Sequence, residues 1–262
     1  MKIIHFTDTH LMAPGVCLHG LDPGARLAAC VSDIAARHAD ADFCVVTGDI
    51  ADRGEAQAYD HARELLAPLP MPTHVIPGNH DDRAAFLRAF PDSPLDEHGF
   101  VQGAVRNAHG HFLLLDTLSP EHGSCGAYCA ARRAWLAAEL ERASDAPVYL
   151  FMHHPPFDVA IPNLDSIGMV EPERFAALVA AAGNVRHLFF GHVHRPISGL
   201  WKGIGFSTLY GTNHQVRLDF EGRGRLAFTA EPPAYSVVLI DAEHVLVHTH
   251  HYDTNQNNIR ED

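Results

Sequence analysis

The stretch VIPGNHDD, residues 75–82, places an apolar run directly before a cluster of polar side chains. The run from Thr73 to Pro77 has the composition of a buried strand, and it stops at Gly78, where the backbone must turn off the strand. Glycine, asparagine and aspartate are ordinary turn residues, but a turn has no particular need of a histidine at position 80. The stretch therefore predicts a strand whose carboxyl end presents metal-binding or proton-transferring side chains.

The same arrangement recurs at four other β-rich runs, which are 2–7, 43–48, 147–152 and 185–190. The side chains just beyond the five strand ends are Asp8, His10, Asp49, Asn79, His80, His153, His154, His192 and His194. A single such residue beyond a strand is more often a cap or a turn residue than a ligand, whereas five coincidences favour a site. Because ligands bind outside the carboxyl ends of strands in α/β sheets, we expect these side chains to meet at one edge.

Helical segments separate the early strands. Apolar residues recur at helical spacing in 24–38, 55–66, 82–90, 132–143 and 172–183. Residues 100–117 read as a hairpin, and beyond Ile197 only strands follow, at 204–210, 214–220, 235–241 and 244–250. This order predicts an α/β fold of two packed sheets with helices outside. Since the chain shows neither an internal repeat nor a Pro/Ser linker, we expect one domain over 1–262, with a strand-rich part at 197–250.

Composition excludes several classes of partner. The 262 residues carry a formal net charge of −13 without a run of lysine or arginine, and binding long nucleic acid needs a positive face. No stretch approaches the roughly 20 apolar residues of a membrane span. The five scattered cysteines form no CxxC pair, and the N-terminal residues lack an apolar signal segment. We therefore expect a cytoplasmic protein that binds neither long nucleic acid nor membrane.

Spacing and ligand type point to metal ions. Asp8 and His10 stand two residues apart, so in an extended chain both side chains leave the same face and can hold one ion, and the same holds for His192 and His194. Oxygen and imidazole donors without a thiolate favour Mn, Fe, Co or Zn in a hydrolytic site. Seven ligands exceed the need of one ion, so we expect two divalent ions about 3.5–4 Å apart. Asp49, alone at its strand end, is the candidate bridge between them.

Taken in order, five motifs resemble those of the calcineurin-like metallophosphoesterase superfamily: D-x-H (8–10), GD (48–49), GNHD (78–81), HH (153–154) and GHVH (191–194). The resemblance implies a four-layer α/β/β/α sandwich with two mixed β-sheets. It also implies two metal sites that share Asp49, the first completed by Asp8, His10 and His194, the second by Asn79, His153 and His192. His153 is taken as the ligand because it continues the strand directly, so that His154 should point away.

Finer similarities, such as TGDIADRGEAQAY, HHPPF and EPPAYSVVLI, resemble the class III cyclic-nucleotide and glycerophosphodiester phosphodiesterases. They imply hydrolysis of small phosphodiesters, glycerophosphodiester-like or of broad specificity, by attack of a metal-bound hydroxide. A 3′,5′-cyclic nucleotide such as cAMP is the alternative substrate. His80 is expected to lie over the phosphate, and the segment GTNHQV (211–216) to bring His214 to the site, where either histidine could donate the leaving-group proton. An exposed histidine at a strand start fits His214 equally well.

The amino-acid sequence leaves the roles of several more residues open. Asp81 either orients His80 or is a solvated acid of the turn. A non-catalytic scaffold is disfavoured because all seven ligand positions hold competent residues. In related diesterases the C-terminal region contributes to oligomer contacts, which implies a homodimer or a higher homo-oligomer. The loops 11–23 and 157–170 and the C-terminal strands should form the pocket for the ester group. Its candidate liners are Leu11, His19, Phe157 and Tyr210, although surface or core positions are favoured for each of them.

Overall fold

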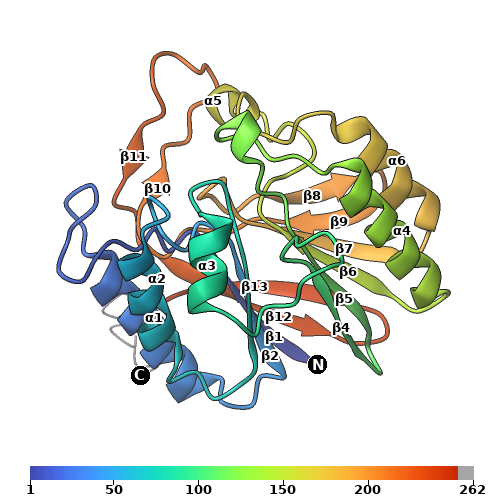
Figure 1. Ribbon diagram of the computed structural model, residues 1–262, viewed down its shortest axis with the longest axis horizontal. Coiled ribbons are helices and arrows are strands. Elements are labelled where there is room, and N and C mark those ends of the chain that lie inside the picture. The colour runs from blue at the N-terminus through green and yellow to red at the C-terminus, as the bar shows by residue number, and fades with distance from the viewer. Residues whose placement is uncertain (253–262) are drawn as a thin grey trace, which may run out of the picture.

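The computed structural model describes residues 1–252, in which two β-sheets pack face to face between two layers of helices (Figure 1). The first sheet contains, in spatial order, β13 (Val245–His251), β12 (Ala234–Ile240), β1 (Lys2–Phe6), β2 (Phe43–Thr47) and β3 (Thr73–Ile76). The second contains β4 (Gly103–Asn107), β5 (Gly110–Leu115), β6 (Val148–Met152), β7 (Val185–Phe190), β9 (Ile204–Ser207) and β8 (Ser198–Trp201). Both sheets mix parallel and antiparallel pairs, which confirms the predicted fold class.

The helices divide between the two outer faces. The first sheet is covered by α1 (Pro23–Arg37), α2 (Ala56–Leu66) and α3 (Arg83–Ala89), and the second by α4 (Ala130–Ala143) and α6 (Pro172–Ala182) (Figure 1). Helix α1 begins where the Asp22 side chain accepts a hydrogen bond from the amide of Ala25, with Pro23 in its first turn. Its residues Leu27, Val31 and Ile34 are buried against the sheet, at the spacing that the sequence predicts.

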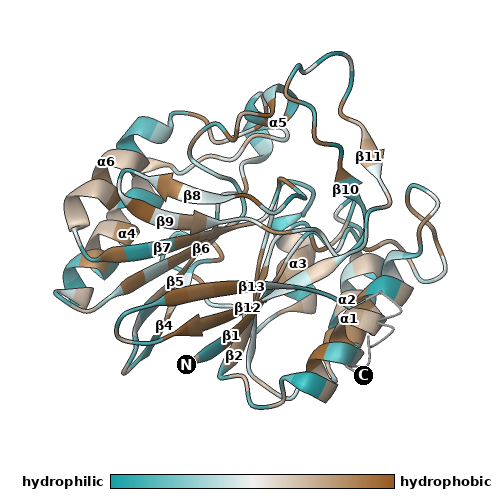
Figure 2. Ribbon diagram, turned by 180° about the vertical axis from the view of Figure 1, so that it is seen from behind, coloured by the Kyte–Doolittle hydropathy of each residue, from teal (hydrophilic) through white to brown (hydrophobic). Residues whose placement is uncertain are grey.

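Alternation along the strands builds three apolar layers. In β1, Ile3 points into the layer between the sheets, whereas Ile4 and Phe6 point towards the helices. The layer between the sheets is aromatic in part, since Phe151 and Phe189 stack with ring centroids 4.4 Å apart. Each such side chain contributes roughly 1.5–3 kcal/mol on burial. Figure 2 shows the apolar residues gathered on the strands.

Parallel pairing brings the ends of several strands to one edge. Strands β1, β2 and β3 run parallel, and so do β5, β6, β7 and β9, so that within each sheet the carboxyl ends of these strands lie together. Ligand sites of α/β sheets form at this edge.

Asp116 follows β5 at the same edge but has another role. Its fully buried carboxylate accepts two hydrogen bonds from the Arg83 guanidinium, at 2.8 and 3.0 Å, and further ones from the amides of Val101 and Leu118. Arg83 belongs to α3, on the first sheet, and Asp116 follows a strand of the second. This partly buried ion pair therefore ties the two halves together next to the edge where the predicted ligand side chains lie.

The structure differs from the predicted elements mainly in the C-terminal third. The predicted strand at 214–220 is only β10 (Gln215–Val216), which pairs with β11 (Phe228–Thr229), and 204–210 ends at Ser207. Strand β8 and the short helix α5 (Pro162–Asp165) were not predicted, because β8 is an exposed strand stabilised by pairing with β9 and α5 is a single turn. Among residues 1–252 we find no helix whose length and apolar character would let it cross a membrane.

Candidate metal centre

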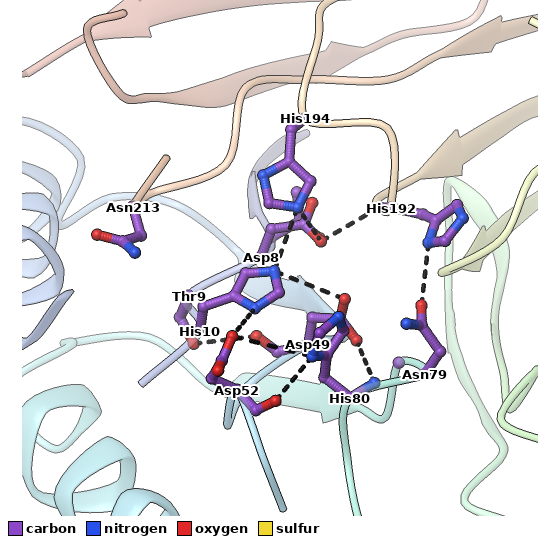
Figure 3. A network of polar contacts seen from close by, with 12 residues as sticks. Asp8, Thr9, His10, Asp49, Asp52, Asn79, His80, His192, His194 and Asn213 are labelled. Carbon is purple, nitrogen blue, oxygen red and sulfur yellow. Dashed lines mark hydrogen bonds and ion pairs between the residues drawn. The ribbon is translucent and has the colours of Figure 1, made fainter. Parts of the chain in front are cut away.

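The seven predicted ligands lie together at the carboxyl edge of the strands, around the Asp49 carboxylate. Figure 3 labels all of them except His153. Asp49 Oδ2 is 3.6 Å from Nε2 of His10 and 3.3 Å from Nε2 of His153. On the His10 side, His194 Nε2 lies 3.2 Å from His10 Nε2 and 3.4 Å from Asp8 Oδ1. We call Asp8, His10 and His194 the first donor group. The carboxylate thus stands between two separate sets of donor atoms.

The second donor group consists of Asn79, His153 and His192, on the other side of Asp49. Asn79 Oδ1 is 3.2 Å from His153 Nε2 and 3.0 Å from His192 Nδ1. Asn79 is half-buried, whereas both histidines and Asp49 are almost fully buried. The fold therefore brings together the same two groups of side chains that the family resemblance assigned to two metal ions.

Hydrogen bonds fix which imidazole nitrogen faces inward. His153 Nδ1 donates to the carbonyl of Thr47 at 2.7 Å, and His194 Nδ1 donates to the carbonyl of His214 at 2.8 Å. His192 Nε2 donates in the same way to the carbonyl of Ile167 at 3.0 Å. A ring nitrogen that bears the proton leaves the other with a lone pair, and these lone pairs point to the centre of the site.

Lone pairs and carboxylate oxygens that face one another repel unless a positive charge lies between them. His10 Nδ1 is occupied by the Asp52 carboxylate at 3.1 Å, so His10 Nε2 and His194 Nε2 meet as acceptors. Within the described residues Asp8 Oδ2 is buried without a hydrogen-bond partner. Nitrogen and carboxylate donors in this arrangement fit divalent cations of the Mn, Fe, Co and Zn type.

Burial and neighbouring charges shift the pKa values of the ionisable groups in the centre. Burial opposes the ionisation of Asp49, but the attraction of His153 and His80 holds the pKa of its carboxyl well below the usual range. Burial likewise opposes a proton on His153, yet the charge of Asp49 raises the pKa of His153 to about 9. Burial lowers the pKa of His192 to about 3, so this ring is neutral. The centre therefore stabilises positive charge beside Asp49, where a metal ion and a proton compete.

The ligand pairs do not lie in extended chain, and that premise of the sequence argument is wrong. Asp8, His10 and Asp49 have φ values of 53°, 43° and 50°, and His192 and His194 have 68° and 47°. This left-handed region is strained for non-glycine residues, and such strain is typical of functional sites. Asp8 and His10 both approach His194 Nε2, because the backbone coils beyond the strand end. His192 instead contacts Asn79 in the second donor group, so the expectation that His192 and His194 hold one ion is wrong.

Gly78 and Gly48 leave the room that the centre needs. A Cβ atom on Gly78 would lie 2.2 Å from Asp49 Oδ1 and 2.5 Å from the Asp49 amide nitrogen. At Gly48, where φ is +92°, a Cβ atom would lie 2.5 Å from His153 Nδ1. A side chain at either position collides with a ligand.

His80 is placed by two contacts at the rim of the centre. Its amide donates to Asp49 Oδ1 at 2.9 Å, and its ring Nδ1 donates to the carbonyl of Asp52 at 2.7 Å. The side chain is 39% exposed and faces the cavity over the donor groups. Asp52, which sequence reasoning missed although it stands within the motif GDIAD, thus supports both His10 and His80.

Both predicted roles of Asp81 are wrong. Its buried carboxylate accepts hydrogen bonds from the amides of Ile50, Ala51 and Gly78 and from the hydroxyl of Tyr59. These donors bind Asp81 from the loop after β2 and from its own turn, so it holds the two ligand-bearing loops together. Asp82 caps α3 by accepting from the amide of Ala85.

Two further histidines differ from the sequence expectation. His214 is buried, with its ring centroid 4.6 Å from that of His194, so the alternative of an exposed strand-start residue is wrong. His154 was expected to point away, but its ring centroid lies 4.6 Å from that of His192 and its Nδ1 bonds to Thr117 Oγ1. Strand β6 ends at Met152, so the alternation that would separate the two side chains no longer holds.

A cavity of about 160 Å³ opens above both donor groups. Five of the predicted ligands line it, all except Asp8 and His153, together with Asp52 and His80. The other lining residues are His19, Ser124, Leu164, Ile167, His214, Val216, Leu226 and Phe228. Of the suggested pocket liners, His19 lines this cavity. Leu11 is buried in the apolar core between the first sheet and its helices, Phe157 packs on Phe190, and Tyr210 lies against His251.

A family model described as calcineurin-like phosphoesterase matches residues 1–196, which is most of the chain. The chain belongs to the calcineurin-like phosphoesterase family. A protein of Rhodopseudomonas palustris named as a probable cyclic nucleotide phosphodiesterase is 42% identical over 252 residues, covering 95% of this chain and 91% of the relative. A glycerophosphodiester phosphodiesterase of Enterobacter lignolyticus is 33% identical over 221 residues, covering 82% of this chain and 79% of the relative.

Solved structures agree at the level of the fold. A dimetal phosphatase from Danio rerio has a TM-score of 0.71 at 15% identity, with 96% of each chain covered. The expected calcineurin-like family, the expected sandwich and the expected class of metal-dependent phosphodiesterase are confirmed. The His and Asp side chains form clusters that could hold metal ions.

We expect Gly78→Ala to empty the centre. The new Cβ must displace the Asp49 carboxylate, which both donor groups share, and losses of this kind cost roughly 10–100-fold in metal affinity. The metal content of the purified variant, measured by plasma mass spectrometry, should fall to a small fraction of the parent's. Gly168→Ala is the control, since its Cβ would lie 3.5 Å from the nearest atom, and it should keep the metal. Full metal occupancy in Gly78→Ala would contradict this role of the turn.

Proposed function

We propose that the chain hydrolyses small phosphodiesters, with glycerophosphodiester-like or broad specificity, at the centre around Asp49. The single observation that carries the proposal is the position of the Asp49 carboxylate between two donor groups of inward-facing lone pairs. A small, partly apolar cavity above this centre suits a small diester rather than a polymer. All seven ligand positions hold competent donors, which disfavours the scaffold alternative.

We assign the first ion to Asp8, His10, Asp49 and His194, and the second to Asp49, Asn79, His153 and His192. Their donor sets suit two divalent ions from among Mn, Fe, Zn and Co. When bound, such ions neutralise the phosphodiester anion and lower the pKa of coordinated water towards about 7. The chain's own contribution is to fix the tautomer of each ligand through carbonyl hydrogen bonds such as those from His153 to Thr47 and from His194 to His214.

We assign the remaining chemistry to His80 and His214. His80 projects into the cavity beside the centre, with Nδ1 held by the Asp52 carbonyl, so that its Nε2 is free to face the substrate phosphate or leaving group. An imidazole in this position can donate a proton to a departing alkoxide. His214 forms the adjacent wall and completes the pocket around the phosphate.

A 3′,5′-cyclic nucleotide such as cAMP is the second candidate substrate. The relative from Rhodopseudomonas palustris bears a cyclic-nucleotide name, whereas the relative from Enterobacter lignolyticus bears a glycerophosphodiester name. Both substrates are small diesters and place the same demand on the centre. We also propose a reducing compartment, the cytoplasm, because the five cysteines, all within residues 1–252, are free thiols.

Removal of metal should abolish turnover. After treatment with a chelator and verified loss of metal, the protein should hydrolyse bis(p-nitrophenyl) phosphate at background rate, and Mn, Co or Zn should restore activity. The matched measurement on p-nitrophenyl phosphate should show a lower kcat/KM for the monoester than for the diester. Full turnover by the metal-free protein would refute the assignment of two ions.

Substitutions at Asp49 and His80 should separate metal binding from proton transfer. Asp49→Ala removes the oxygen shared by both donor groups, so metal content and rate should fall together. His80→Ala should keep both ions while kcat falls by about 10²–10⁴-fold on a diester with an alkoxide leaving group, which needs a proton. The loss should be smaller on bis(p-nitrophenyl) phosphate, whose leaving group needs little protonation.

Two outcomes would correct the assignment of His80. An equal loss on both substrates would make His80 a phosphate-positioning residue, and loss of an ion in His80→Ala would make it part of the metal site. His244→Ala is the matched control, because this exposed histidine pairs with Asp241 on a distant turn and its removal should change neither rate nor metal content.

We further propose that the chain forms a homodimer or a higher homo-oligomer through its strand-rich part, 197–250. Strands β8 and β13 each form one edge of their sheet, and they carry the exposed side chains Leu200 and Leu246. Light scattering should give a mass of at least twice the 28.7 kDa of one chain. A species of one-chain mass at all concentrations would reject self-association.

A further inference from the structure

Three aromatic rings from distant parts of the chain meet at the mouth of the cavity. His19 stacks on Phe228, with centroids 4.5 Å apart and ring planes at 29°. His214 meets both rings edge to face, with centroids 4.7 Å from each. We call His19 and Phe228 the ring pair.

Two loops hold the ring pair in place. His19 sits in a tight turn closed by bridging hydrogen bonds between Leu18 and Leu21, and its φ of 53° is held by that turn. Phe228 opens β11, where it lies opposite Val216 of β10. The N-terminal loop before α1 and the β10–β11 ribbon lie side by side in both views (Figures 1 and 2).

The ring pair stands at a fixed distance from the metal centre. His214 lies between them, since its other contacts are with the rings of His10 and His194 at 4.8 and 4.6 Å. The His214 ring therefore contacts both the ring pair and two of the predicted metal ligands.

The ring pair keeps apolar surface open to the cavity. Phe228 is 42% exposed and His19 is exposed, although both line the cavity wall. The same wall continues in Val216, Leu226 and Ile167. Large aromatic side chains left open beside a binding site commonly serve as contact surface for a ligand.

We propose that His19 and Phe228 form a stacking platform for an aromatic ring, a nucleobase, in the ester group of the substrate. The inference rests on the proposed phosphodiesterase function and names the feature by which this chain selects among small diesters. A base stacks on aromatic faces whatever its hydrogen-bonding pattern, whereas a glycerol or ethanolamine group has no ring to stack. The platform thus favours nucleotide diesters over glycerophosphodiesters.

The test is a selectivity ratio. Phe228→Leu keeps apolar bulk and removes the ring, and Phe228→Tyr keeps the ring. We expect the ratio of kcat/KM for cAMP to that for glycerophosphoethanolamine to fall about tenfold in Phe228→Leu and to change by less than about twofold in Phe228→Tyr. Phe220→Leu is the matched control, because Phe220 is 67% exposed on the loop between β10 and β11 and is not among the residues that line the cavity.

A binding measurement gives a readout without turnover. Calorimetric titration with adenosine 5′-monophosphate and with inorganic phosphate should show the ratio of their affinities falling about tenfold in Phe228→Leu and in His19→Ala. An unchanged ratio, or equal loss for both ligands, would overturn the platform.

The two proposals fail separately. If the parent protein hydrolyses glycerophosphoethanolamine but shows no preference for cAMP and binds the monophosphate no more tightly than phosphate, the platform is refuted and the phosphodiesterase function stands. If the parent hydrolyses neither diester, the proposed function is refuted, and the affinity ratio for the two ligands still decides the platform.

Discussion

A buried carboxylate that faces imidazole lone pairs on two sides is the constraint on which the rest of this structure depends. Asp49 Oδ1 accepts a hydrogen bond from the amide of His80, while Asp49 Oδ2 faces His10 and His153. Anionic and lone-pair donors at these distances are stable only around positive charge, and burial makes that demand stronger. The outward hydrogen bonds of the histidines prevent the rings from turning away, so the protein retains a centre that requires cations.

The surrounding fold keeps this arrangement from relaxing. Five ligand residues have left-handed backbone, which costs of order 1–3 kcal/mol each and persists only where neighbouring structure over-determines it. Here the loops after β1 and β2 bond to each other through the amides of Asp8, His10 and Leu11. The Asp81 carboxylate binds the loop after β2, and the partly buried pair of Arg83 and Asp116 joins the two sandwich halves nearby. The packed core and the bonded loops thus hold the donor side chains in fixed positions.

The outer wall of the site has a different character. The centre is polar and buried, whereas the ring pair and the residues around it are apolar and partly exposed, and they come from loops and a two-residue ribbon. Loops of this kind tolerate substitution better than the elements that they connect. Two proteins similar to this chain carry different substrate names, one a cyclic nucleotide and the other a glycerophosphodiester.

The sequence by itself was sufficient for the strand ends, the sandwich of two sheets and the gathering of the seven donors, because apolar strands that end in Asp, Asn or His are a local pattern that parallel pairing turns into one edge. Only the tertiary structure decided the contacts made across loops. Asp81 could not be assigned, since its partners include the amides of Ile50 and Ala51 and the hydroxyl of Tyr59. The convergence of Asp8 with His10 depends on left-handed backbone that the bonded loops impose, and the stacking of His19 on Phe228 joins residues from opposite ends of the chain. Local periodicity carries no record of such contacts, because they arise only when separate loops are packed against one another.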